Sequence, residues 1–117
     1  MTIDLRKYPR YPCHLKIHIT NEQGNSWDMS TLDVSIEGMR ILSKHKNLVF
    51  EPETLITIRL EKQKNLEPMI FSGTVRHYSI EQNDDMIFGV SITSLNDDSK
   101  TRWNSVIEHV RLSTKIV

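Results

Sequence analysis

The sequence predicts a mainly β protein, a six-stranded antiparallel β-barrel with an N-terminal arm and a C-terminal α-helix. Six short segments rich in β-prone or alternating apolar residues are separated by polar turn clusters, which is typical of a barrel or sandwich. The first residues are basic and interrupted by Pro9 and Pro12, and proline disfavours helical geometry at the residue before it. Near the end, apolar residues recur at helical spacing.

A chain of 117 residues fits one domain and can bury a core of its own without disulfides. We expect this single domain to consist of a flexible basic arm over residues 1–11, a barrel over residues 12–95 and a helix over residues 96–115. No internal repeat is visible in the sequence.

The predicted strands follow from alternation and from turn residues. Leu15, Ile17 and Ile19 alternate with polar residues, which indicates a strand with one buried face. In the fifth strand, Gly73 is expected to mark a β-bulge or a close approach of two backbones. The six predicted strands are residues 15–20, 26–34, 39–43, 55–60, a long segment that begins at Met69 and includes Val75, and residues 86–93.

The predicted helix has recognisable ends and one apolar stripe. Asn96 is a favourable N-cap residue, and Asp97 and Asp98 place negative charge in the first turn, where it interacts favourably with the helix dipole. The stripe at positions i, i+3, i+4 and i+7, which we expect to pack on the barrel or a partner, consists of Trp103, Val106, Ile107 and Val110.

Composition argues against several classes of protein. The formal net charge is zero, with 15 basic and 15 acidic residues, so the chain is not expected to bind nucleic acid non-specifically. Aromatic residues make up only 7% of the chain, whereas barrels that bind single-stranded nucleic acid need aromatic side chains for base stacking.

The sequence also argues against a membrane or secreted protein. No apolar run approaches the ~20 residues that a membrane-spanning helix needs, so no membrane insertion is expected. The N-terminus lacks the apolar stretch of a secretory signal. A lone cysteine, Cys13, cannot form an internal disulfide and is compatible with a reducing compartment. We therefore expect a cytoplasmic protein in which Cys13 is a small packing residue.

No catalytic or metal-ligating motif stands out. The five histidines do not fall into a metal-ligand spacing with Cys13 or with nearby carboxylates. There is no phosphate-binding glycine-rich loop and no nucleophile elbow. We therefore expect a protein that is not an enzyme and that needs no metal and no cofactor.

The N-terminal stretch carries two arginines at a fixed spacing. Arg6 and Arg10 would lie ~13 Å apart between their Cα atoms on an extended chain. A guanidinium matches guanine O6 and N7 with two parallel hydrogen bonds, and it also binds phosphate oxygens. Two such groups can hold separate parts of a guanine-bearing anion. Taken alone, this spacing is more typical of a solvated basic arm.

A second motif, Asp33-Val34-Ser35-Ile36-Glu37-Gly38, lies between two predicted strands. Asp33 can accept hydrogen bonds from the N1–H and N2–H₂ donors of guanine, or it can orient an arginine of the arm. Ser35 can donate to a phosphate or cap the turn. Gly38 is expected to adopt a positive φ in a tight turn and to let a ligand approach the backbone. The alternative is an ordinary hairpin turn with local hydrogen bonds.

The two motifs in this order resemble the signature of PilZ domains, bacterial receptors for cyclic di-GMP. Gly73-Thr74-Val75 and Phe88-Gly89-Val90-Ser91-Ile92 are also similar to late barrel strands of that family, so the resemblance covers nearly the whole chain. It implies a PilZ-like barrel without enzymatic activity, whose arm orders over cyclic di-GMP and which signals to a separate effector protein. The implied ligand-binding residues are Arg6, Lys7, Arg10, Asp33, Ser35 and Gly38.

The chain departs from the family pattern at two places. Lys7 stands where members often carry a second arginine, and lysine lacks the planar fork of guanidinium donors. Some members place an aromatic residue late in the fifth strand, for which His77 and Tyr78 are the candidates here. Parity with Val75 predicts His77 toward the interior or the barrel mouth and Tyr78 outward. One ligand molecule or a stacked pair is compatible with the resemblance, and the alternative function is a PilZ-like protein-interaction module that binds no nucleotide.

Overall fold

The computed structural model describes residues 8–45, 48, 50–63, 65–81, 83–94 and 96–113. The described elements follow one another as seven strands and a helix. They are β1 (Tyr11–Pro12), β2 (Lys16–Asn21), β3 (Ser26–Ser35), β4 (Gly38–Ser43), β5 (Leu55–Leu60), β6 (Met69–Ile80), β7 (Met86–Ser94) and α1 (Asp97–Ser113).

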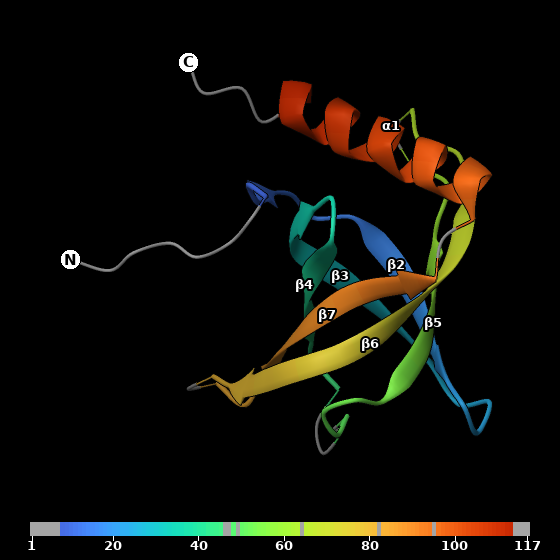
Figure 1. Ribbon diagram of the computed structural model, residues 1–117. Coiled ribbons are helices and arrows are strands. Elements are labelled where there is room, and N and C mark those ends of the chain that lie inside the picture. The colour runs from blue at the N-terminus through green and yellow to red at the C-terminus, as the bar shows by residue number, and fades with distance from the viewer. Residues whose placement is uncertain are drawn as a thin grey trace.

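Six of these strands close into an antiparallel barrel. The strand order is β1-β3-β2-β5-β6-β7-β4, and an additional pairing of β3 with β4 closes the sheet on itself (Figure 1). Closure removes unpaired sheet edges. The short strand β1 lies outside the cycle and pairs with the end of β3, with Tyr11 opposite Val34 and Pro12 opposite Asp33.

The barrel interior is filled by the apolar residues that the alternation predicted. In β5, buried and exposed residues alternate strictly, and Leu15, Ile17 and Ile19 are each 1% exposed. Trp27, which is half-buried, packs its ring edge-on against Phe50, with a centroid distance of 5.4 Å. Cys13 is partly buried against the same core, as expected for a packing residue.

Strand β6 contains two irregularities where it pairs with β7. The register shifts between Ser72 and Gly73 and again between Val75 and His77. The first shift confirms the predicted bulge, and a Cβ at Gly73 would lie 2.7 Å from Val90 Cγ1, which explains the need for glycine there. The second bulge was not predicted, and it changes the faces on which the residues after Val75 lie.

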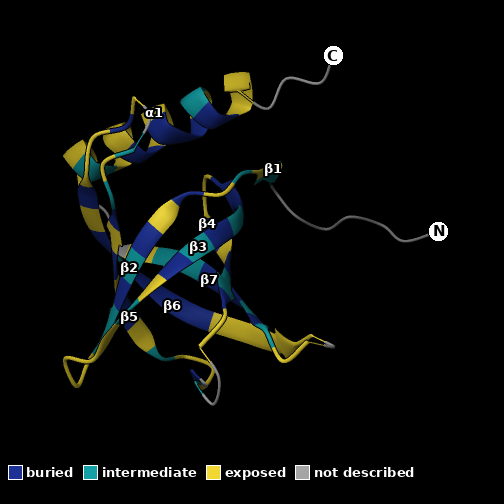
Figure 2. Cartoon of the chain, turned by 180° about the vertical axis from the view of Figure 1, so that it is seen from behind, coloured by how far each residue is buried: buried dark blue, intermediate teal, exposed yellow. Residues whose placement is uncertain are grey.

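Helix α1 covers one end of the barrel (Figure 1). Its N-terminus is capped as predicted, because the Ser99 amide donates to Asn96 Oδ1 at 2.8 Å. The buried residues of the helix are the predicted stripe, Trp103, Val106, Ile107 and Val110. Figure 2 shows that the buried side of α1 faces the barrel. In the described part of the chain, no helix is long and apolar enough to cross a membrane.

The predicted strands are all present, with ends that differ by a few residues. The long fifth strand, for which the sequence indicated a start at Met69 and no end, is β6 and extends to Ile80. Tyr11, placed in the arm by the sequence, belongs to β1. Residues 1–7 of the predicted arm, with Arg6 and Lys7, and residues 114–115 of the predicted helix lie outside the described residues.

Candidate functional site

The predicted motif residues of the barrel meet at the β3–β4 turn. Asp33 and Ser35 end β3 and Gly38 begins β4, with Ser35 paired to Gly38 and Asp33 paired to Arg40. Asp33 is 5% exposed and Ser35 is 2% exposed. The two residues between the strands, Ile36 and Glu37, are exposed. The turn therefore presents an exposed tip on a base of buried polar groups.

The carboxylate of Asp33 lies between two guanidinium groups. Arg10 Nη1 donates to Asp33 Oδ1 at 3.2 Å, and Arg40 Nε donates to Asp33 Oδ2 at 2.7 Å. The Asp33 side chain is 7% exposed, whereas that of Arg40 is 45% exposed. Charge-assisted hydrogen bonds of this kind offset the cost of burying a carboxylate. Of the two roles that the sequence left open for Asp33, orientation of an arm arginine is present here.

Strand β1 explains how Arg10 reaches this carboxylate. Pro12 is the Cα partner of Asp33 in the β1–β3 pair, so the chain entering β1 runs beside the end of β3. Arg10 precedes Pro12 by two residues, and its side chain is 24% exposed. The second arginine of the predicted arm motif is thus brought to the turn by backbone pairing.

Ser35 and Gly38 make the turn compact. Ser35 Oγ donates to the Gly38 carbonyl oxygen at 3.4 Å, a local bond within the turn. The expected positive φ at Gly38 is wrong, because Gly24 is the glycine with a positive φ in the described chain. Glycine is needed at position 38 for a steric reason: an added Cβ would lie 2.1 Å from the Val90 carbonyl oxygen. Strand β7 therefore approaches β4 as closely as the backbone allows.

Helix α1 fixes the turn from the other side. The indole Nε1 of Trp103 donates to the carbonyl oxygens of Ser35 at 3.2 Å and Ile36 at 3.1 Å. Trp103 is 1% exposed, so the two carbonyl oxygens give its buried indole N–H the acceptors that a buried donor needs. The turn is thereby connected to the helix as well as to the barrel.

A row of paired residues extends the site across the outer face of the sheet. Arg40 on β4 pairs with Gly89 on β7, and Gly89 pairs with His77 on β6. The His77 ring occupies the space above Gly89, since an added Cβ there would lie 2.1 Å from His77 Cε1. Directly paired residues have their side chains on the same face of a sheet. His77 therefore shares the outer face with Arg40.

The placement of His77 corrects the parity prediction. His77 was expected to share the face of Val75 and to point toward the interior or the barrel mouth. The bulge between these two residues turns it outward instead, where it is exposed. Tyr78 instead pairs with Phe88, which belongs to the core, and it remains 40% exposed. His77 is thus the late β6 ring that lies in line with the β3–β4 turn.

Two site arginines were missed by the sequence reasoning. Arg40 follows Gly38 by two residues, so strand parity in 39–43 was a signal that could have placed it beside Asp33. Arg76 had no such signal. Its Nε donates to Ser91 Oγ at 3.2 Å, and Ser91 is the Cα partner of Gly38. Arg76 also forms an ion pair with Glu53, with an Nη1–Oε2 distance of 2.7 Å.

A cleft opens between the turn and helix α1. Its volume is about 430 Å³, and Lys100 contributes a positive charge to it. The other lining residues include Tyr8, Ile36, Glu37, Trp103 and Asn104. Among the described residues around the turn, four cationic groups stand against three carboxylates, a small excess of positive charge that favours an anionic ligand. The cations are Arg10, Arg40, Arg76 and Lys100, and the carboxylates are Asp33, Glu37 and Glu53.

The fold of this chain is similar to the folds of several solved structures. The PilZ domain of YcgR from Escherichia coli, solved with c-di-GMP, superposes with a TM-score of 0.78 at 11% identity, over 94% of each chain. The inhibitor of motility MotI/DgrA of Bacillus subtilis has a TM-score of 0.78 at 12% identity, with 97% of this chain and 54% of that chain covered. These likenesses establish the fold.

A third structure, the MrkH–c-di-GMP complex of K. pneumonia, has a TM-score of 0.77 at 14% identity and covers 95% of this chain and 53% of that chain. The present chain thus spans about half the length of MotI/DgrA and MrkH. No curated protein matches the sequence. The family model described as "PilZ domain" matches residues 4–109. Because this match covers most of the 117 residues, the chain belongs to the PilZ domain family.

Proposed function

We propose that this chain is a non-enzymatic receptor for cyclic di-GMP that binds its ligand at the β3–β4 turn. The observation that carries the proposal is the buried Asp33 carboxylate held between Arg10 and Arg40. It places donors for phosphate and guanine beside a compact turn. Membership of the PilZ family and the c-di-GMP complexes of YcgR and MrkH support the identity of the ligand.

The two arginines have different roles in this proposal. The Arg40–Asp33 bond, at 2.7 Å, is shorter than the Arg10–Asp33 bond, at 3.2 Å. We therefore expect Arg40 to keep Asp33 in place while Arg10 turns its guanidinium toward guanine or phosphate. One oxygen of Asp33 then becomes available to accept from the N1–H or N2–H₂ donors of guanine.

The remaining ligand contacts come from the motif residues and from the outer face of β6. Arg6 and Lys7 provide further phosphate or guanine contacts in this proposal, and Arg40 adds the third guanidinium that Lys7 cannot supply. Ser35 and Gly38 form the facing edge. The exposed His77 ring above Gly89 offers a flat surface for stacking a guanine base, as aromatic side chains do with unpaired bases.

The contacts between the β3–β4 turn and helix α1 offer a route by which ligand binding is signalled to a partner protein. When the arm closes over cyclic di-GMP, the surface formed by the arm, the turn and the neighbouring end of α1 changes its shape and charge. Trp103 links the turn to α1 through its two hydrogen bonds, so a separate effector protein that contacts the helix can read the bound state.

The direct test is isothermal titration of the chain with cyclic di-GMP. We expect saturable binding that weakens by about 1.5–3 kcal/mol, or roughly 10- to 150-fold, in Arg10→Ala and in Asp33→Ala, because each removes a hydrogen bond to a charged group. Arg59→Ala is the matched control, since Arg59 lies on β5 and forms an exposed ion pair with Glu61, which follows that strand. The proposal would be contradicted if the unmodified chain did not bind cyclic di-GMP, or if both site variants bound it with unchanged affinity. The chain would then be better described as an interaction module that binds its partner equally well without nucleotide.

A further inference from the structure

A second polar groove lies where β2, β3 and the segment after β5 run side by side. Its volume is about 750 Å³. Asp28, one of its lining residues, precedes Asp33 by five residues on β3, which corresponds to about 17 Å along a strand. The groove is therefore distinct from the β3–β4 turn, and what it binds does not depend on the proposed function.

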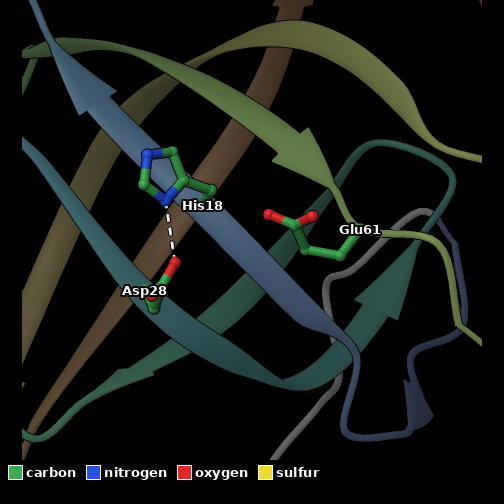
Figure 3. A group of neighbouring side chains, drawn as sticks. All are labelled: His18, Asp28 and Glu61. Carbon is green, nitrogen blue, oxygen red and sulfur yellow. Dashed lines mark hydrogen bonds and ion pairs between the residues drawn. The ribbon is translucent and has the colours of Figure 1, made fainter.

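Strand pairing gathers three metal-ligating side chains in this groove. His18 on β2 is the Cα partner of Asp28 on β3, and its Cα partner on the other side is Arg59 of β5. Glu61 follows Arg59 by two residues and thus lies on the same side of the sheet. One ligand atom from each of His18, Asp28 and Glu61 lies within 4.8 Å of the others. Figure 3 shows the three side chains close together, with a hydrogen bond joining His18 to Asp28 and the Glu61 carboxylate facing them.

We propose that His18, Asp28 and Glu61 form a binding site for a divalent transition-metal ion, with zinc as the best match. Zinc accepts imidazole nitrogen and carboxylate oxygen, and three protein ligands with water in the fourth position are a common arrangement. Calcium and magnesium prefer oxygen ligands alone. The presence of an imidazole therefore favours zinc and its neighbours in the first transition row.

Two of the three donor atoms already lie close together. His18 Nδ1 lies 2.8 Å from Asp28 Oδ1, so an imidazole nitrogen and a carboxylate oxygen face each other. A metal ion would replace the proton that the two atoms share, and the exposed Asp28 and partly buried Glu61 side chains can rotate to shorten the remaining distances.

The positive charges of the groove weaken its affinity for a cation, but they leave a carboxylate oxygen of Glu61 available to a metal ion. Arg59 donates through Nε and Nη2, at 3.3 Å and 3.0 Å, and both bonds go to Glu61 Oε1. In the described structure Oε2 of Glu61 has no partner, so Arg59 orients the carboxylate without occupying it. Lys16 and Lys44 also line the groove and oppose a cation. We therefore expect weaker zinc binding than the same three ligands would give without neighbouring cations.

A second imidazole stands beside the proposed site. His45 Nε2 lies 3.0 Å from the Asp28 carbonyl oxygen, so two histidines contact the same residue of β3. Sequence spacing did not indicate this cluster, and no metal was expected, because the ligands belong to different strands and only the β2–β3 and β2–β5 registers bring them together.

The test is isothermal titration of the intact chain, without a histidine tag, with zinc chloride at neutral pH. We expect one zinc ion per chain, with affinity that falls by at least about 10- to 100-fold in His18→Ala and in Glu61→Gln. Glu61→Gln preserves shape and keeps the test valid if His18→Ala fails to fold. Two control variants, His109→Ala and Cys13→Ser, remove other potential zinc ligands and should leave the affinity unchanged.

The site would be overturned by no saturable binding to the unmodified chain, by unchanged affinity in both groove variants, or by loss of binding in either control. Excess magnesium should not displace zinc, and displacement would equally contradict a site that contains imidazole. Cyclic di-GMP titration of Glu61→Gln separates the two proposals, because the nucleotide site should be unaffected by a change in this groove.

Discussion

At the residue scale, Asp33 is the group on which both halves of the candidate site depend. Its carboxylate binds Arg10, which enters with β1, and Arg40, which belongs to the barrel. The sequence motif indicated Asp33, Ser35 and Gly38 without their neighbours. The charge partner Arg40 lies only two residues beyond Gly38, where strand parity was a signal for it, and the β3–β4 register places it opposite Asp33.

Gly38 permits a first prediction about stability. In Gly38→Ala the new Cβ would lie 2.1 Å from the Val90 carbonyl oxygen, a backbone atom that cannot move without shifting β7. We expect a loss of about 3 kcal/mol in the free energy of unfolding, the upper range for overpacking. Chemical denaturation measures it.

Gly24→Ala is the comparison for this prediction. Gly24 has a positive φ of 87° but no atom within 4 Å of an added Cβ, so its cost of about 1 kcal/mol comes from backbone conformation alone. If Gly38→Ala costs no more than Gly24→Ala, close approach of β4 and β7 is not the reason for glycine at position 38.

The His18–Asp28 pair permits a prediction about pH. The hydrogen bond from His18 is the main reason that the pKa of Asp28 lies below its ordinary value of 3.8. Because the pKa of Asp28 is lowered in the folded state, the pair stabilises the fold at pH values above the ordinary Asp28 pKa. This contribution to stability is lost as the pH falls through the lowered pKa. In His18→Ala, the Asp28 pKa measured by carboxyl NMR should rise.

Glu108 is the internal control for that titration. Its pKa is lowered by a hydrogen bond from Arg111 on the same helix, far along the chain from His18, so it should titrate identically in both proteins. An Asp28 pKa that stays low in His18→Ala would show that the histidine is not the cause.

At the scale of elements, helix α1 and the β3–β4 turn behave as one unit. The helix buries its apolar stripe against the barrel, where the ring of Trp103 lies 5.2 Å from that of Phe71, and the same indole holds the turn. Helix, cap and stripe were predictable from local spacing. The indole contact with Ser35 and Ile36 was not, because it joins residues distant in sequence.

Trp103→Phe should separate packing from hydrogen bonding at this contact. Phenylalanine keeps an aromatic ring beside Phe71 but removes the donor shared by two carbonyl groups. We expect a loss of about 1–3 kcal/mol in the free energy of unfolding and faster amide hydrogen exchange in the turn. Leu112→Ala, at a position 59% exposed on the same helix, should change neither quantity. Unchanged exchange at Ile36 and Glu37 in Trp103→Phe would contradict the link between helix and turn.

At the scale of the whole molecule, most of the architecture could be predicted from sequence. Alternation marked the strands because one face of each is buried in the barrel, and the helical stripe marked α1. The second bulge of β6 left no local signal, since it arises from pairing with β7. For that reason the face of His77 was predicted incorrectly. The short strand β1 was also missed, because two residues are too few to show a pattern.

The site shows the same division between local and long-range information. Asp33, Ser35, Gly38 and Arg10 could be proposed from the sequence because they belong to short motifs. Arg76, His77 and the groove of His18, Asp28 and Glu61 depend on neighbours across strands, and strand register is only weakly visible in a single sequence. The closed barrel is therefore what converts separate segments into two distinct polar sites.

The measurement that tests the central claim most directly is backbone amide NMR during titration with cyclic di-GMP. We expect saturable shift changes at Arg10, across Asp33–Gly38 and at Gly89, with Asp28 unaffected, and no such changes with cyclic di-AMP, whose adenine lacks the O6 acceptor that arginine reads. Absence of saturable changes, or changes centred on the groove around Asp28, would contradict a cyclic di-GMP site at the β3–β4 turn.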